Sequence, residues 1–65
     1  MPYVNSSAIA RIEYDPLSRT LSIWFHASGR YDYYDVPSGL YQGLLHASSK
    51  GTFFNRFIRD DYGHA

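Results

Sequence analysis

Residues 31–45 read YDYYDVPSGLYQGLL, and the hydrophobic period of the chain changes at Pro37. Before this proline, apolar and polar residues alternate, which is typical of strands with one buried face. After it, Leu40, Leu44 and their neighbours recur at helical spacing, and a proline suits the first turn of a helix. The change in period predicts strands up to Val36 and helices beyond Pro37.

Two further strands are predicted upstream of this point. The residues expected to share one face of each are Ala10, Ile12 and Tyr14 in the first strand and Leu21, Ile23 and Phe25 in the second. The segment Asp15-Pro16-Leu17-Ser18-Arg19 has the composition of a turn between these strands. Ser28-Gly29 marks the next reversal, because glycine accepts a positive φ. The third strand is expected over residues 31–36 and ends at Pro37.

The second half of the chain predicts two short helices. Gly39 and Gly43 each weaken the first helix by about 1 kcal/mol relative to alanine, so tertiary packing must sustain it. Ser49-Lys50-Gly51 interrupts the pattern and offers an N-cap for the second helix. The apolar stripe of that helix is Phe53, Phe54, Phe57 and Ile58. The predicted fold is α+β, a three-stranded antiparallel sheet followed by two short helices packed on one face. The predicted core consists of Ile12, Leu21, Ile23, Phe25, Val36, Leu44, Phe54 and Ile58.

Length and composition limit the classes of protein that remain. The 65 residues predict a single domain over residues 1–65. The sequence has no cysteine, so disulfides and thiolate metal sites are excluded, and no signal peptide or membrane span is recognisable, which favours a cytoplasmic location. Net charge is zero, so any contact with nucleic acid must depend on a local patch.

The register of the second hairpin decides which aromatic side chains are exposed. If Ser28-Gly29 forms a two-residue loop, Tyr31 and Tyr33 point outward on the same face as Trp24. A four-residue first loop would add Arg11 beside Trp24. This arrangement would form a platform on which unpaired bases could stack.

A different loop reverses this prediction. If the loop has three residues and Gly29 lies in a bulge, the register shifts by one residue. Tyr31 and Tyr33 then lie opposite Phe25 and Ile23 and become core residues. The sequence leaves both registers open.

Lys50, Arg56 and Arg59 form a second candidate feature. On a helix that begins near Ser49, Arg56 and Arg59 lie three residues apart on one polar side, from which they could contact phosphates. The acidic residues 60–61 follow directly and cancel much of this charge.

Catalytic and metal-binding patterns are missing from the sequence. His26, His46 and His64 are not paired at metal-ligand spacing, and no motif places a base beside a serine. We therefore predict a protein that is not an enzyme, with no catalytic residues, no metal site and no cofactor.

A series of short motifs extends along nearly the whole chain. They are Ser6-Ser7, Ile9, Glu13-Tyr14-Asp15, Thr20-Leu21, Phe25, Gly29, Tyr31-Asp32-Tyr33, Val36-Pro37, Tyr41, Leu44, Ala47-Ser48-Ser49-Lys50-Gly51, Phe54-Asn55, Ile58-Arg59 and Tyr62. Their order and spacing resembles the KTSC domain, a family named for its occurrence at the C-terminus of some lysyl-tRNA synthetases. The family also occurs as small stand-alone bacterial proteins. The resemblance implies no catalytic residues, and the synthetase context suggests RNA binding.

The sequence thus predicts a small non-enzymatic domain that binds single-stranded RNA or tRNA weakly. The alternative is a protein-interaction or self-association module, including a homodimer, that uses an aromatic face or a free sheet edge. The candidate nucleic-acid-binding residues are Arg11, Trp24, Tyr31, Tyr33, Lys50, Arg56 and Arg59. A single lysine and zero net charge depart from what a strong RNA binder would have.

Overall fold

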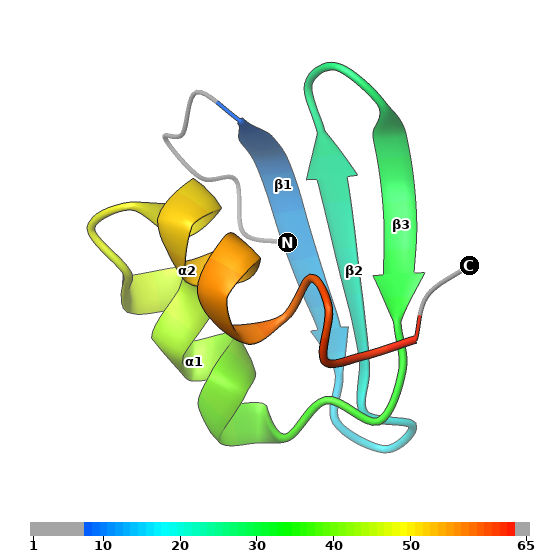
Figure 1. Ribbon diagram of the computed structural model, residues 1–65. Coiled ribbons are helices and arrows are strands. Elements are labelled where there is room, and N and C mark those ends of the chain that lie inside the picture. Colours follow the sequence, from blue (N-terminus) through cyan, green and yellow to red (C-terminus); the bar gives the residue numbers. More distant parts are fainter. Residues whose placement is uncertain (1–7, 64–65) are drawn as a thin grey trace.

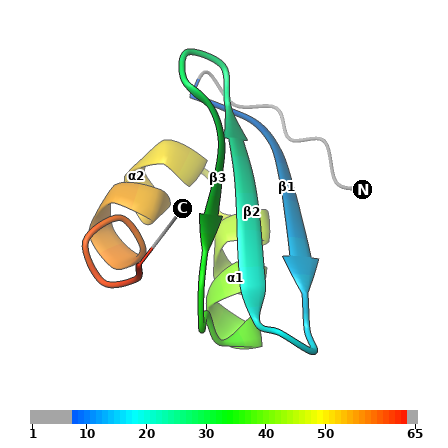
Figure 2. The same ribbon diagram turned by 90° about the vertical axis from the view of Figure 1, so that its right-hand side faces the viewer.

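Three antiparallel strands are followed by two helices in the computed structural model, which describes residues 8–63 (Figure 1). The strands are β1 (Ile9–Asp15), β2 (Thr20–Phe25) and β3 (Gly29–Tyr33), in the spatial order β1-β2-β3. The helices are α1 (Ser38–His46) and α2 (Lys50–Phe57). Figure 2 shows both helices on the same side of the sheet. The predicted α+β fold is confirmed, with the change from strands to helices at Pro37.

The first hairpin has the predicted four-residue loop. Asp15 pairs with Thr20, and the Asp15 carboxylate accepts a hydrogen bond of 3.0 Å from the backbone N–H of Leu17. This side-chain bond holds the turn in the way expected of aspartate before proline. The loop length places Arg11 directly opposite Trp24, as predicted.

The start of β1 differs from the prediction. The pairing with β2 shifts between Ile9 and Arg11, so Ala10 is an additional residue in a bulge. Because side chains alternate along a strand, one inserted residue exchanges the faces on either side of it. Ile9 is therefore fully buried, whereas Ala10, which we assigned to the core face, is only partly buried.

Beyond the bulge, β1 keeps the predicted face. Ile12 is fully buried, and Tyr14 packs against the core. The Tyr14 hydroxyl donates a 2.6 Å hydrogen bond to the carbonyl of Val36, and its ring stacks on Tyr41 at 4.8 Å between centroids. Tyr14 thus ties the sheet to the segment that enters α1.

The second hairpin excludes the two-residue loop. Phe25 pairs with Gly29 across a loop of residues 26–28, and Gly29 has a φ of 84°. Tyr31 lies opposite Ile23, whereas the three-residue alternative placed it opposite Phe25, two residues later in β2. A shift of two residues keeps each side chain on its face. Tyr31 therefore points to the core side, as that alternative expected.

β3 ends at Tyr33 and not at Val36 as predicted. After Tyr33 the backbone groups find other partners: the N–H of Tyr34 bonds to Gly63, and the N–H of Val36 bonds to Arg19. The chain also turns at Asp35, whose φ is 59°. Val36 leaves the sheet but remains fully buried.

The core lies between the sheet and the helices. The buried residues are Ile9, Ile12, Leu21, Ile23, Tyr33, Val36, Leu44, Phe54 and Ile58. All the predicted core residues are among them except Phe25, which is only partly buried. Ile9 was not predicted, and Tyr33 was predicted to be in the core only by the three-residue-loop alternative.

The predicted stripe of α2 divides into two pairs. Phe54 and Ile58 are buried in the core, whereas Phe57 is 46% exposed and its ring lies 4.8 Å from that of Phe53. Ser49 is the predicted N-cap, and its hydroxyl accepts a hydrogen bond from the N–H of Thr52. The cap fixes where α2 begins and therefore which residues face the sheet.

Gly43 allows Phe53 of α2 to approach α1 closely. A Cβ atom at Gly43 would lie 2.7 Å from Cζ of Phe53, whereas a Cβ atom at Gly39 would meet nothing within 4 Å. We expect Gly39→Ala to raise the free energy of unfolding by up to about 1 kcal/mol, because alanine has the higher helix propensity.

Gly43→Ala should instead lower the free energy of unfolding by about 1 kcal/mol, because overpacking costs roughly 1–3 kcal/mol and exceeds the gain in propensity. Urea unfolding of both variants measures the difference. Equal stabilisation by the two substitutions would mean that the Phe53 ring moves aside freely.

Candidate nucleic-acid interface

The residues predicted to bind nucleic acid lie on different surfaces of the protein. Trp24 and Arg11 are on the sheet face away from the helices, because they alternate with the buried residues of their strands. Tyr31 and Tyr33 are on the opposite, helix-covered face, and Tyr33 is only 5% exposed. The predicted platform of Trp24 and Tyr33 is therefore wrong, because the register of the second hairpin separates them.

Trp24 is flanked by arginines from both neighbouring strands. The guanidinium carbon of Arg11 lies 4.1 Å from the Trp24 ring centroid, and that of Arg30 lies 5.2 Å from it. Each arginine also pairs with a carboxylate on its own strand, Arg11 with Glu13 and Arg30 with Asp32. The hydrogen bond from Arg30 lowers the pKa of Asp32 below its ordinary value, so this pair is ionised at neutral pH. A base could stack on Trp24 only by displacing one of these arginines.

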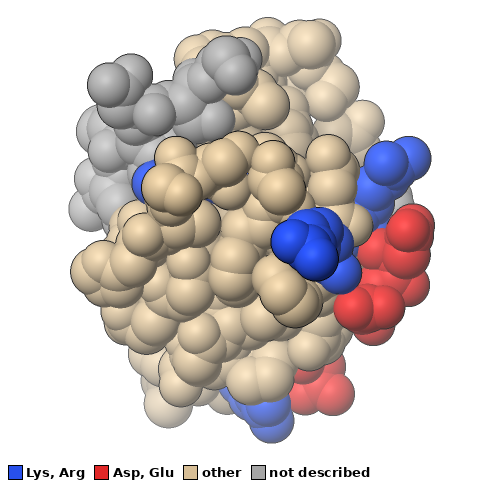
Figure 3. All heavy atoms as spheres, turned by 60° about the vertical axis from the view of Figure 1, so that its left-hand side comes forward, with Lys and Arg blue, Asp and Glu red and all other residues tan. Residues whose placement is uncertain are grey.

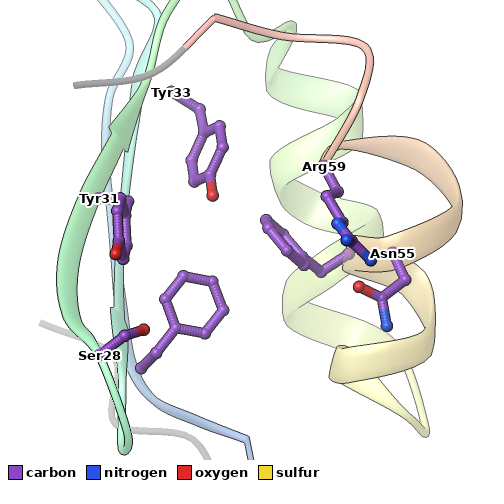
Figure 4. Close-up of a pocket in the computed structure, with 7 residues that line it drawn as sticks. Ser28, Tyr31, Tyr33, Asn55 and Arg59 are labelled. Atoms are coloured by element: carbon purple, nitrogen blue, oxygen red, sulfur yellow. The ribbon is translucent and has the colours of Figure 1, made fainter.

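A pocket of about 360 Å³ opens between the sheet and α2. Its lining combines the aromatic residues Phe25, Tyr31, Tyr33 and Phe54 with the polar residues Ser28, Asn55 and Arg59. Figure 4 shows Ser28 and Tyr31 on the β3 side, Asn55 and Arg59 on the α2 side, and Tyr33 pointing into the space between them. Three candidate residues, Tyr31, Arg59 and the buried Tyr33, thus meet at one site.

The aromatic rings of the pocket pack edge to face. The Phe25 ring centroid lies 5.8 Å from that of Tyr31 and 5.1 Å from that of Phe54, and Phe54 lies 5.4 Å from Tyr33. Such contacts favour a fixed arrangement of the rings. The pocket therefore has a preformed aromatic wall, which is a property of small-molecule sites.

Arg59 gives the pocket its charge. Within residues 8–63 it is the only ionic group that lines the pocket, and it is exposed at the rim. Burial raises the pKa of the Tyr33 phenol above its ordinary value, Tyr31 adds to the rise, and Arg59 opposes it. The Tyr33 hydroxyl is thus protonated at neutral pH and can donate a hydrogen bond. The pocket suits an anionic ligand with a flat apolar part.

The other basic residues do not extend this site. The Lys50 ammonium donates a 3.0 Å hydrogen bond to the carbonyl of Ala47. Arg56 lines a separate hollow and lies 6.0 Å from the Phe57 ring. Arg59 lies two residues beyond the end of α2, so it does not form one polar side with Arg56 as predicted. On the face in Figure 3, Lys and Arg side chains stand apart and acidic side chains lie beside several of them.

Four pocket residues were not predicted to belong to a site: Phe25, Ser28, Phe54 and Asn55. Asn55 and Arg59 are four residues apart, but Arg59 lies beyond the end of α2, so helical spacing alone does not place them together. The position of Phe25 at the pocket likewise depends on how α2 packs on the sheet.

The comparison with known families agrees with this arrangement of elements. The KTSC domain matches residues 5–62. The chain belongs to the KTSC domain family. The crystal structure of a KTSC domain protein from Yersinia pestis superimposes with a TM-score of 0.97 at 39% identity, covering 98% of this chain and 90% of that one.

Relatives of this KTSC domain include both short and long proteins. A protein from Tsukamurella paurometabola is 39% identical over 59 residues, which is 91% of this chain and 88% of that protein. A lysine–tRNA ligase from Nostoc punctiforme is 36% identical over 56 residues, or 86% of this chain. The matched part is only 10% of the ligase. Within residues 8–63 of the KTSC domain, neither helix is long and apolar enough to cross a membrane.

Proposed function

We propose that this KTSC domain is a weak binding module for unpaired RNA, including the single-stranded parts of tRNA, and that the pocket between β3 and α2 is its site. The observation that carries the proposal is the meeting of aromatic side chains with Arg59 in one preformed pocket. Proteins recognise single-stranded RNA by stacking its bases on aromatic rings and by contacting its phosphates with basic groups. Tyr31 and Arg59 supply one group of each kind.

The charge of the protein predicts low affinity. Net charge is zero, and acidic residues 60–61 follow Arg59 in the sequence. Binding should therefore involve one or two phosphate contacts and fall in the range of about 10⁻⁴–10⁻⁶ M that is usual for non-specific binding. A module of this affinity acts best when it is attached to, or assembled with, a larger RNA-binding protein. The similarity to part of a lysine–tRNA ligase is consistent with such a context.

Arg59→Ala tests the proposal against a matched control. Arg59 lies at the pocket, whereas Arg30 lies on the opposite sheet face and is also exposed, so Arg59→Ala and Arg30→Ala change the net charge equally. In NMR titrations with tRNA and with a mixed pool of single-stranded RNA, we expect amides around the pocket to shift. Arg59→Ala should weaken binding and lower the slope of log affinity against log salt by about one unit. Arg30→Ala should leave both nearly unchanged.

Two results would contradict this function. An equal loss of RNA affinity in Arg59→Ala and Arg30→Ala would indicate that binding depends only on net charge. The absence of any RNA-induced shift at low salt would remove RNA binding altogether. In that case, shifts on the Trp24 face that grow with protein concentration would favour the self-association alternative, because tryptophan and arginine are enriched in protein interfaces.

A further inference from the structure

Asn55 stands at the rim of the pocket on the side opposite Tyr31 (Figure 4). Its amide carries a donor and an acceptor together, which is the combination that pairs with the edge of a base. Arg59, four residues later, lines the same pocket. Both polar side chains therefore border a space whose other wall is aromatic.

The chemistry of the lining restricts the class of ligand. Aromatic cages bind cations when the ring faces are free of positive charge. Here Arg59 lies at the rim and none of the described residues that line the pocket carries a carboxylate, so a cation is disfavoured. The volume of about 360 Å³ lies at the small end of the range for ligand sites, roughly 300–1,000 Å³, so the pocket has room for one base.

We infer that the pocket selects a single unpaired purine, an inference that rests on the proposed RNA-binding function. Asn55 and Arg59, the two polar side chains at the rim, are of the types that form paired hydrogen bonds with purines. Asparagine pairs with N6 and N7 of adenine, and arginine pairs with O6 and N7 of guanine. In single-stranded RNA this edge of the purine is free to be contacted.

A purine also matches the apolar wall better than a pyrimidine does. Its two fused rings cover more of the surface formed by Phe25, Tyr31 and Phe54, and stacking increases with the overlapping area. With adenine in the pocket, Asn55 pairs with the base and Arg59 remains available for a phosphate. With guanine in the pocket, Arg59 pairs with the edge of the base.

The test compares four pentanucleotides that differ only at the central base: UUAUU, UUGUU, UUCUU and UUUUU. We expect the two purine-containing oligonucleotides to bind about fivefold more tightly or better, which is the low end for a bidentate base contact. NMR amide shifts around the pocket give the affinities and the location. The uridine background avoids the self-stacking of oligoadenylate.

Two variants separate the roles of the rim residues. Asn55→Leu keeps the size of the side chain and has higher helix propensity, so it should fold. It should reduce the advantage of UUAUU over UUUUU to the part that stacking on the aromatic wall provides. Arg59→Lys keeps the charge but removes the planar guanidinium group that makes two parallel hydrogen bonds. It should therefore reduce the advantage of UUGUU over UUUUU. Arg56→Lys, outside the pocket, serves as the control and should change neither preference.

The possible failures point to different conclusions. If all four oligonucleotides shift the pocket amides with equal affinity, purine selection is wrong and RNA binding at the pocket stands. If the purine advantage is undiminished in Asn55→Leu and in Arg59→Lys, the rim residues do not select the base. If no oligonucleotide shifts any signal at low salt, the inference and the proposed function both fail.

Discussion

Phe54→Ala is expected to lower the free energy of unfolding by roughly 3–5 kcal/mol. Phe54 is 7% exposed and contacts the rings of both Phe25 and Tyr33, so its removal opens a cavity at the junction of the sheet and α2. A domain of this size rarely has more than about 3–5 kcal/mol of stability from its core. The variant should therefore be largely unfolded at room temperature.

Phe57→Ala is the matched control, because Phe57 lies on the same helix and is 46% exposed. It should cost far less stability than Phe54→Ala. Circular dichroism during thermal and urea unfolding measures both variants. Phe54→Leu retains most of the volume and should fold with an intermediate melting temperature, which allows the comparison even if Phe54→Ala does not fold. Similar melting of Phe54→Ala and Phe57→Ala would place Phe54 outside the core.

Ile9→Ala is expected to cost about 2–5 kcal/mol, the second-largest effect. Ile9 is fully buried because the bulge in β1 turns it toward the helices. The loss would show that the bulge determines which residues of β1 stabilise the fold. Without the bulge, Ile9 would lie on the outer face and its truncation would have little effect.

Leu17→Ala provides the control for Ile9, since Leu17 is 96% exposed in the first turn. Its melting temperature should equal that of the unmodified protein. Ile9→Val should cost about 0.5–1.5 kcal/mol and remain folded. If Ile9→Ala proved as harmless as Leu17→Ala, the register of β1 described above would be wrong.

Much of the fold follows from local properties of the chain. The alternation before Pro37 and the helical spacing after it predict the element order, and Asp15 and Ser49 mark the first turn and the start of α2 with side-chain hydrogen bonds. Strand and helix periods and caps depend on neighbouring residues only. They could therefore be predicted without knowing what packs against what.

The grouping of residues at the candidate site was predicted less well than the fold, because it does not depend on neighbouring residues only. The predicted grouping of the candidate residues was wrong: Trp24 and Tyr33 lie on opposite faces, and Arg56 and Arg59 line different hollows. Residue type indicates what a side chain can bind. Which side chains lie together depends on the strand register and on the end of the helix.

Periodicity and local turn chemistry were enough to predict the element order, the first hairpin and most of the core. The bulge at Ala10, the register of Tyr31 and Tyr33, and the end of β3 depend instead on tertiary packing. One inserted residue exchanges the faces of a strand without changing its local pattern. The pocket likewise joins Tyr31 to Asn55 and Arg59, more than twenty residues away in the sequence. These residues come together because α2 packs against the sheet. Local sequence patterns do not distinguish this packing from its alternatives, whereas the burial of residues far apart in the sequence does.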